Sequence, residues 1–124
     1  MKPRIAIPEP HSGQRDYVER TLPQYIRAVE ESGGEAVVIS LQAPPEDIAK
    51  ILARCQGVLL PGSSADVEPS KYSAARDPRT NPADPKRDTA DELLLQDAYN
   101  MRKPIFGICY GIQSLNVYRS GTLV

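Results

Sequence analysis

Residues 103–113 read Lys-Pro-Ile-Phe-Gly-Ile-Cys-Tyr-Gly-Ile-Gln, and this stretch is the most informative part of the sequence. An apolar run, Ile105–Ile108, leads into a turn that Gly107 and Gly111 flank, with Cys109 at its tip. A strand that ends in a turn of small residues and opens into a helix raises one side chain above a sheet, as in a nucleophile elbow. The partial positive charge of the helix N-terminus favours a thiolate there. The pattern therefore predicts a nucleophilic Cys109 rather than an inert core cysteine.

Strands and helices are expected to alternate along the rest of the chain. Short continuous apolar runs predict strands buried on both faces at residues 4–8, 36–39, 57–61 and 105–108. Helical spacing of apolar residues predicts helices at 16–32, from 44 onward, at 87–102 and at 111–118. A further strand is expected at 120–124. This order predicts an α/β, doubly wound, mostly parallel sheet with helices on both faces.

Several local features carry their own expectations. Pro23 predicts a kink or a break in the first helix, which Gly33 and Gly34 end. Asp88 is expected to cap the third helix, since apolar periodicity follows it. Residues 62–86 are rich in Ser, Asp, Pro and Arg, and predict a long loop that is functional or mobile.

Composition excludes several classes of function. The 124 residues, expected to form one domain over 1–124, carry a net charge of -1, which argues against nucleic-acid binding. No apolar run approaches the ~20 residues of a membrane span. Two cysteines make no disulfide framework, so a reduced, cytoplasmic location is expected. No metal-ligand cluster or phosphate-binding glycine motif is present, so we expect neither a metal nor a cofactor.

Three segments together resemble a known superfamily. They are Pro61–Tyr72 with its Asp66-Val67-Glu68-Pro69 core, Arg87-Asp88 with Asp91 and Leu94, and Pro104–Val117 with the following Gly121-Thr122-Leu123. These segments are similar to the class I glutamine amidotransferase superfamily, in particular its gamma-glutamyl hydrolase type, which includes gamma-glutamyl-gamma-aminobutyrate hydrolases. The resemblance implies a flavodoxin-like fold and a small gamma-glutamyl substrate.

The resemblance also implies roles for residues around the elbow. Cys109 would attack a gamma-glutamyl amide carbonyl and form a gamma-glutamyl thioester. The backbone N–H of Tyr110 would stabilise the oxyanion, with a second donor from Gly62 or Ser63. Gln113 would touch the glutamyl group or brace the elbow.

The loop above the site and the only histidine leave questions open. Asp66 and Tyr72 would order that loop or meet substrate, and a solvated loop is an equal alternative. His11 follows the first strand on the edge where α/β sheets carry ligands. The family does not use this position as its base, so we do not expect a catalytic role for His11.

The chain departs from the family in length and in its missing triad partners. Family members are longer, and a histidine and a glutamate near their C-terminus complete the triad. We therefore expect the N-terminal portion of a longer enzyme, cut after the elbow and inactive alone. An exposed apolar surface would pair it with the C-terminal half or with a second copy. The alternatives are a glutaminase subunit that delivers ammonia to a partner synthase, and a non-catalytic truncated fragment or pseudoenzyme.

Overall fold

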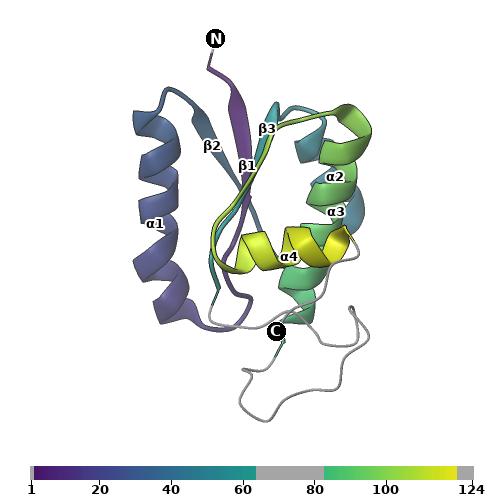
Figure 1. Ribbon diagram of the computed structural model, residues 1–124. Coiled ribbons are helices and arrows are strands. Elements are labelled where there is room, and N and C mark those ends of the chain that lie inside the picture. The colour runs from purple at the N-terminus through teal and green to yellow at the C-terminus, as the bar shows by residue number, and fades with distance from the viewer. Residues whose placement is uncertain (1, 64–82, 120–124) are drawn as a thin grey trace.

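The computed structural model describes residues 2–63 and 83–119, and a four-stranded parallel sheet lies at its centre (Figure 1). The strands, in the sheet order β2-β1-β3-β4, are β1 (Arg4–Pro8), β2 (Glu35–Ile39), β3 (Gly57–Leu60) and β4 (Ile105–Gly107). All three pairings are parallel. The predicted strands in the described residues are therefore confirmed, within one residue at each end.

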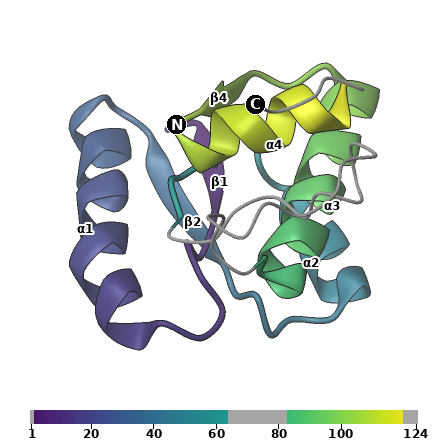
Figure 2. The same cartoon turned by 60° about the horizontal axis from the view of Figure 1, so that its bottom comes forward.

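Helices lie on both faces of the sheet. They are α1 (Arg15–Glu31), α2 (Pro45–Leu52), α3 (Pro85–Met101) and α4 (Tyr110–Tyr118). Figures 1 and 2 show α1 on one side of the sheet and the other three helices on the opposite side. This arrangement confirms the α/β, flavodoxin-like class, because parallel strands joined by helical crossovers need cover on both faces.

The larger hydrophobic core fills the space between the sheet and helices α2 and α3. Its buried residues come from three strands, from these two helices and from the turn after α2: Ala6, Ile39, Ile48, Leu52, Cys55, Val58, Leu60, Leu94, Leu95 and Ala98. Cys55 is only 3% exposed, and its Sγ donates to the carbonyl of Ile51 at 3.4 Å. Burial raises the pKa of the Cys55 thiol. Cys55 is therefore structural, as the sequence predicted.

A smaller core lies under α1, and it explains why the proline in that helix does not divide it. Val29 packs there with Ile7 and Leu59, and Leu22 and Tyr25 lie against the same cluster. The helix runs unbroken from Arg15 to Glu31 with Pro23 inside it. The predicted break into two helices is therefore wrong, because contacts with the sheet on both sides of the proline hold the helix together. The alternative expectation, a kink at Pro23, stays a prediction.

The sheet also has an apolar groove beside α1, at the side where β4 is the edge strand. The groove has a volume of about 530 Å³, and its lining includes Ile5, Val29, Phe106 and Ile108. Phe106 is 61% exposed. What covers this groove, whether a second copy or another polypeptide, stays a prediction.

Some expectations are corrected or untested. Residues 36–39 and 105–108 were expected to be buried on both faces, but β2 and β4 are the edge strands of the sheet. Val38 is 37% exposed and Phe106 is 61% exposed. Most of the predicted loop, residues 64–82, and the predicted strand at 120–124 lie outside the described residues.

Within the described residues, no helix is long and apolar enough to cross a membrane.

The cap of α3 differs from the expectation. The helix begins at Pro85, and the side chain of Asp84 accepts a hydrogen bond from the N–H of Arg87 at 3.3 Å. The carboxylate of Asp88 accepts instead from the phenol O–H of Tyr110. The predicted cap at Asp88 is therefore wrong. The signal that could have found the right one is Asp84 followed by proline at the first helical position.

Asp84 also ties α3 to the turn after β1. The backbone N–H and the hydroxyl of Ser12 both donate to its carboxylate, each at 2.7 Å. Burial by itself would raise the pKa of Asp84, but the hydrogen bonds from Ser12 and Arg87 outweigh it and lower that pKa. The folded state therefore favours the charged carboxylate more than the unfolded state does.

We expect Asp84→Asn to lower the free energy of unfolding at pH 7 by about 1–2 kcal/mol, because asparagine keeps the cap but removes the charge. The folded-state pKa is depressed, so the charge contributes stability above the unfolded value of about 3.9. That contribution is lost as pH falls through the folded pKa, and the two proteins should converge in acid. Urea unfolding at several pH values measures this. The exposed Asp47→Asn is the control, and a constant difference down to pH 2 would contradict the assignment.

Candidate active site

Cys109 occupies a strained position between β4 and α4. It is the N-cap residue of α4, with φ 50° and ψ -106°. Among the described residues only Arg102 shares a positive φ without being glycine, and Arg102 lies in the ordinary left-handed helical region. A non-glycine residue in such a sparsely populated region costs about 1–3 kcal/mol, and such strain clusters at functional sites. The cysteine is exposed, so the strain presents its thiol to solvent.

Two glycines make this geometry possible. A Cβ on Gly107 would lie 2.8 Å from the carbonyl carbon of Gly111. A Cβ on Gly111 would lie 2.1 Å from the carbonyl oxygen of Leu60 in β3. The N–H of Ile108 donates to that same oxygen at 3.0 Å. The first turn of α4 therefore sits directly on the end of β3, with no room for a side chain between them.

The turn after β3 forms the opposite side of the site. Gly62 is buried, and a Cβ built on it would lie 3.7 Å from the Cβ of Cys109. The N–H of Gly62 donates to the hydroxyl oxygen of Tyr25 at 3.1 Å. Gly62 and Ser63 were the alternatives for the second oxyanion donor, and the N–H of Gly62 therefore already has an acceptor. The neighbouring Ser63 is partly exposed, and its role as donor stays a prediction.

The helical side of the site has a backbone donor. Tyr110 is the first residue of α4, so its N–H has no acceptor within the helix. The N–H groups of Ile112 and Gln113 both donate to the carbonyl of Cys109, at 3.0 and 3.1 Å. The side chain of Gln113 is exposed, and its predicted contact with the glutamyl group or with the elbow stays a prediction. Asp66 and Tyr72 lie outside the described residues.

A buried arginine supports both sides of the site. The guanidinium of Arg87 donates to the carboxylate of Asp91 at 2.8 Å and to the carbonyl oxygens of Pro61 at 2.6 Å, Pro10 at 3.0 Å and Gly62 at 3.4 Å. Its side chain is fully buried. The ion pair and the carbonyls offset the cost of burying the charge.

The same guanidinium stacks on the residue that follows the cysteine. The Arg87 Cζ lies 4.6 Å from the ring centroid of Tyr110, which is itself buried. Burial, followed by the hydrogen bond to Asp88, raises the pKa of Tyr110, so its phenol stays neutral and donates. The side chain of Tyr110 is thereby held in the protein interior, and the role of its backbone N–H as an oxyanion donor stays a prediction.

His11 has a structural role in the turn after β1. Its Nδ1 accepts from the N–H groups of Gly13 at 2.9 Å and Gln14 at 3.2 Å. The same atom lies 3.5 Å from a carboxylate oxygen of Asp84. A general base needs a ring nitrogen that is available to take a proton. These contacts support the interpretation that His11 is not the base for Cys109.

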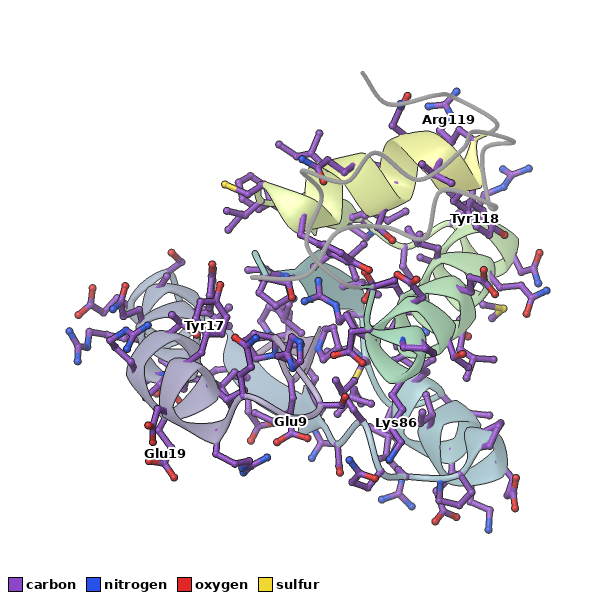
Figure 3. The ribbon with its side chains drawn as sticks, turned by 90° about the horizontal axis from the view of Figure 1, so that it is seen from below. Glu9, Tyr17, Glu19, Lys86, Tyr118 and Arg119 are labelled. Carbon is purple, nitrogen blue, oxygen red and sulfur yellow. The ribbon has the colours of Figure 1, made fainter. Side chains whose placement is uncertain are left out.

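Figure 3 shows the molecule from below, at the carboxyl ends of the strands, with Glu9 after β1, Tyr17 on α1 and Lys86 at the start of α3. In the part of the chain that the structure describes, no group of three or more His, Cys, Asp or Glu side chains is placed to hold a metal ion.

Sequence reasoning missed two residues at this site. Arg87 is named in the sequence analysis only within a segment that resembles the family, and Tyr25 is not singled out there. Arg87 lies four positions before Asp91, but such a spacing is a weak signal of a buried ion pair, since most pairs of this kind are solvated. Nothing in the sequence near Tyr25 indicates that its hydroxyl meets Gly62.

Residues 5–124 match the family model of peptidase C26. The chain belongs to this family. It is 35% identical over 101 residues to a gamma-glutamyl-gamma-aminobutyrate hydrolase of Escherichia coli O157:H7, and the match covers 81% of the chain and 39% of that relative. A putative glutamine amidotransferase of Mycobacterium tuberculosis is 33% identical over 100 residues, which cover 80% of the chain and 32% of that protein.

A further relative, from Lactococcus lactis subsp. cremoris, is a putative glutamine amidotransferase-like protein that is 32% identical over 106 residues, or 86% of the chain and 55% of the relative. The chain thus spans well under two thirds of the length of each of these relatives. The matches confirm the resemblance to the gamma-glutamyl hydrolase type of the glutamine amidotransferase-like superfamily.

Gly111→Ala should lower the free energy of unfolding by about 3 kcal/mol or more, because the new methyl group meets the backbone of β3, which cannot move aside. Gly13→Ala is the matched control, since the nearest atom to its Cβ would be the His11 Cε1 at 3.8 Å. Urea unfolding of the two variants measures the difference. Equal stabilities would show that α4 does not rest on Leu60.

Arg87→Met should lower the free energy of unfolding by about 3–5 kcal/mol, because it removes one partner of a buried ion pair. Arg4→Met is its control, since Arg4 pairs with Glu35 on the surface and should change stability little. Equilibrium unfolding in urea compares the two. A small effect at Arg87 would mean that water or a rearranged side chain replaces the guanidinium.

Proposed function

We propose that this chain supplies the nucleophile and part of the oxyanion site of a cysteine hydrolase that cleaves gamma-glutamyl amide bonds. The observation that carries the proposal is the exposed Cys109, held at φ 50° at the N-terminus of α4 and opposite Gly62. Membership of the peptidase C26 family and the name of the Escherichia coli relative support the substrate class.

In the proposed reaction the Cys109 thiolate attacks the gamma-carbonyl carbon of the substrate. A carbon–sulfur bond forms, and the carbonyl electron pair moves to oxygen, where the N–H of Tyr110 and a donor from the opposite turn stabilise it. When the tetrahedral intermediate collapses, the carbon–nitrogen bond breaks and the amine leaves with a proton. Water then attacks the gamma-glutamyl thioester, releases glutamate and restores the thiol.

Proton transfer in this scheme needs a base and an acid. The only histidine of the chain is His11, and its Nδ1 accepts backbone N–H groups in the turn after β1. The relatives are much longer than this chain. We therefore propose that the histidine and glutamate of the triad come from a second polypeptide segment, and that the 124 residues alone do not turn over substrate.

A glutaminase that passes ammonia to a partner synthase is the second candidate. It is favoured by the names of the relatives from Mycobacterium tuberculosis and Lactococcus lactis subsp. cremoris, a putative glutamine amidotransferase and a putative glutamine amidotransferase-like protein. The two activities differ in their substrate and in their dependence on a partner. A non-catalytic role is the third candidate, and it requires that Cys109 never becomes acylated.

The protein encoded by the whole gene should release glutamate from gamma-glutamyl-gamma-aminobutyrate or a related gamma-glutamyl amide. Cys109→Ala should reduce kcat by about a thousandfold or more, because no thioester can form. Cys55→Ala is the control and should keep the activity, since Cys55 is in the core. Mass spectrometry should find the gamma-glutamyl group on the Cys109 peptide.

Activity that survives Cys109→Ala would remove the proposal. Hydrolysis of glutamine alone, stimulated by a partner protein, would establish the glutaminase instead. The absence of any acyl adduct on Cys109 in the protein from the whole gene would favour the non-catalytic role.

A further inference from the structure

Tyr25 links helix α1 to the candidate site. The residue is partly buried, and its ring lies against the cluster of Ile7, Val29 and Leu59 under the helix. Its hydroxyl oxygen accepts the N–H of Gly62 at 3.1 Å. A side chain from the first helix thus reaches the turn after β3, 37 residues further along the chain.

The hydroxyl of Tyr25 and the thiol-bearing carbon of Cys109 lie against the same side of Gly62. A Cβ on Gly62 would be 3.1 Å from the Tyr25 hydroxyl and 3.7 Å from the Cβ of Cys109. Both groups therefore line the space that a side chain at position 62 would enter. Glycine at this position leaves room for the hydroxyl next to the nucleophile.

The Tyr25 hydroxyl still has a proton to donate. A phenol both accepts and donates, and here the acceptor side is taken by the Gly62 N–H. Over residues 2–63 and 83–119, no acceptor for the Tyr25 proton is found. A hydroxyl that accepts from an amide becomes a stronger donor, because hydrogen bonds in a chain polarise one another.

We propose that the Tyr25 hydroxyl is an oxyanion donor of this site: it takes the Gly62 N–H and passes a hydrogen bond on to the carbonyl oxygen that Cys109 attacks. The inference rests on the proposed function only in that Cys109 attacks a carbonyl. It replaces a direct contact from the Gly62 amide with one relayed through a side chain of α1. Tyr25 transfers no proton in this step, so the phenol is unchanged when the intermediate collapses.

Tyr17 provides a matched control on the same helix. Burial raises the pKa of Tyr17, and the nearby Tyr25 and Cys109 add to the shift, so its phenol lies in the same region. Arg20 lies over its ring, 5.8 Å from the centroid. Tyr17→Phe therefore removes the same atom from the same helix without touching the hydrogen bond to Gly62.

The test compares two reactions of Cys109 in the 124-residue chain and in its Tyr25→Phe and Tyr17→Phe variants. Acylation by p-nitrophenyl acetate passes through an oxyanion: the thiolate adds to the carbonyl, and p-nitrophenolate leaves. Alkylation by iodoacetamide displaces iodide and forms no oxyanion. Mass spectrometry of the Cys109 peptide gives both rates, and urea unfolding shows that each variant is folded.

We expect Tyr25→Phe to slow acylation about tenfold or more, because one oxyanion donor is lost. Alkylation should change less than about twofold, and Tyr17→Phe should leave both rates alone. Equal losses in the two reactions would overturn the proposal, since Tyr25 would then only position Cys109. No change in acylation, or the same loss with Tyr17→Phe, would overturn it too.

The outcome separates this inference from the proposed function. p-Nitrophenyl acetate tests the oxyanion donor without a gamma-glutamyl group or a triad histidine. A selective loss of acylation together with no gamma-glutamyl hydrolysis by the protein from the whole gene would keep the Tyr25 role and remove the substrate class. In a protein that does hydrolyse gamma-glutamyl amides, Tyr25→Phe should lower kcat about tenfold and leave KM nearly unchanged.

Discussion

The buried guanidinium of Arg87 ties the turns after β1 and β3 to each other and to Tyr110, the residue after Cys109. A doubly wound parallel sheet opens a crevice where the chain reverses its direction of winding, at the carboxyl ends of two neighbouring strands. Here those strands are β1 and β3, and the side chain of Arg87 reaches the carbonyls that follow them, at Pro10 and Pro61. The crevice therefore holds part of the protein itself.

This one cation fixes the two sides of the candidate site relative to each other. It donates to the carbonyl of Gly62 on one side and stacks on Tyr110 on the other. Cys109 lies between them, next to Tyr110 in the chain and facing Gly62 in space. Because the guanidinium is planar and fully buried, it holds these groups more rigidly than surface contacts would.

The backbone strain at Cys109 depends on close packing around the elbow. The positive φ of the cysteine is costly, and it persists because the surrounding backbone leaves no alternative. Gly107 and Gly111 pack against backbone atoms of α4 and β3, and α4 in turn packs on α3 and β3. The energy that holds the thiol at the surface therefore comes from close packing beneath it.

Four features could be predicted from the amino-acid sequence: the order of strands and helices, the elbow at Cys109, the structural character of Cys55 and the family. These follow from local patterns, namely apolar runs, helical periodicity and glycines at fixed offsets, which act within a few residues of one another. The sequence alone did not decide how the ends of those elements are tied together.

Only the folded structure shows that Asp84 rather than Asp88 caps α3. The hydroxyl of Ser12 donates to the Asp84 carboxylate, and the hydroxyl of Tyr110 donates to the Asp88 carboxylate. Tertiary structure also decided that α1 runs through Pro23, because contacts with the sheet outweigh the local preference. The roles of Arg87 and Tyr25 depend on carbonyl and amide groups dozens of residues away. No local pattern encodes such pairs: a polar side chain is solvated or buried according to which strand ends the fold brings to it.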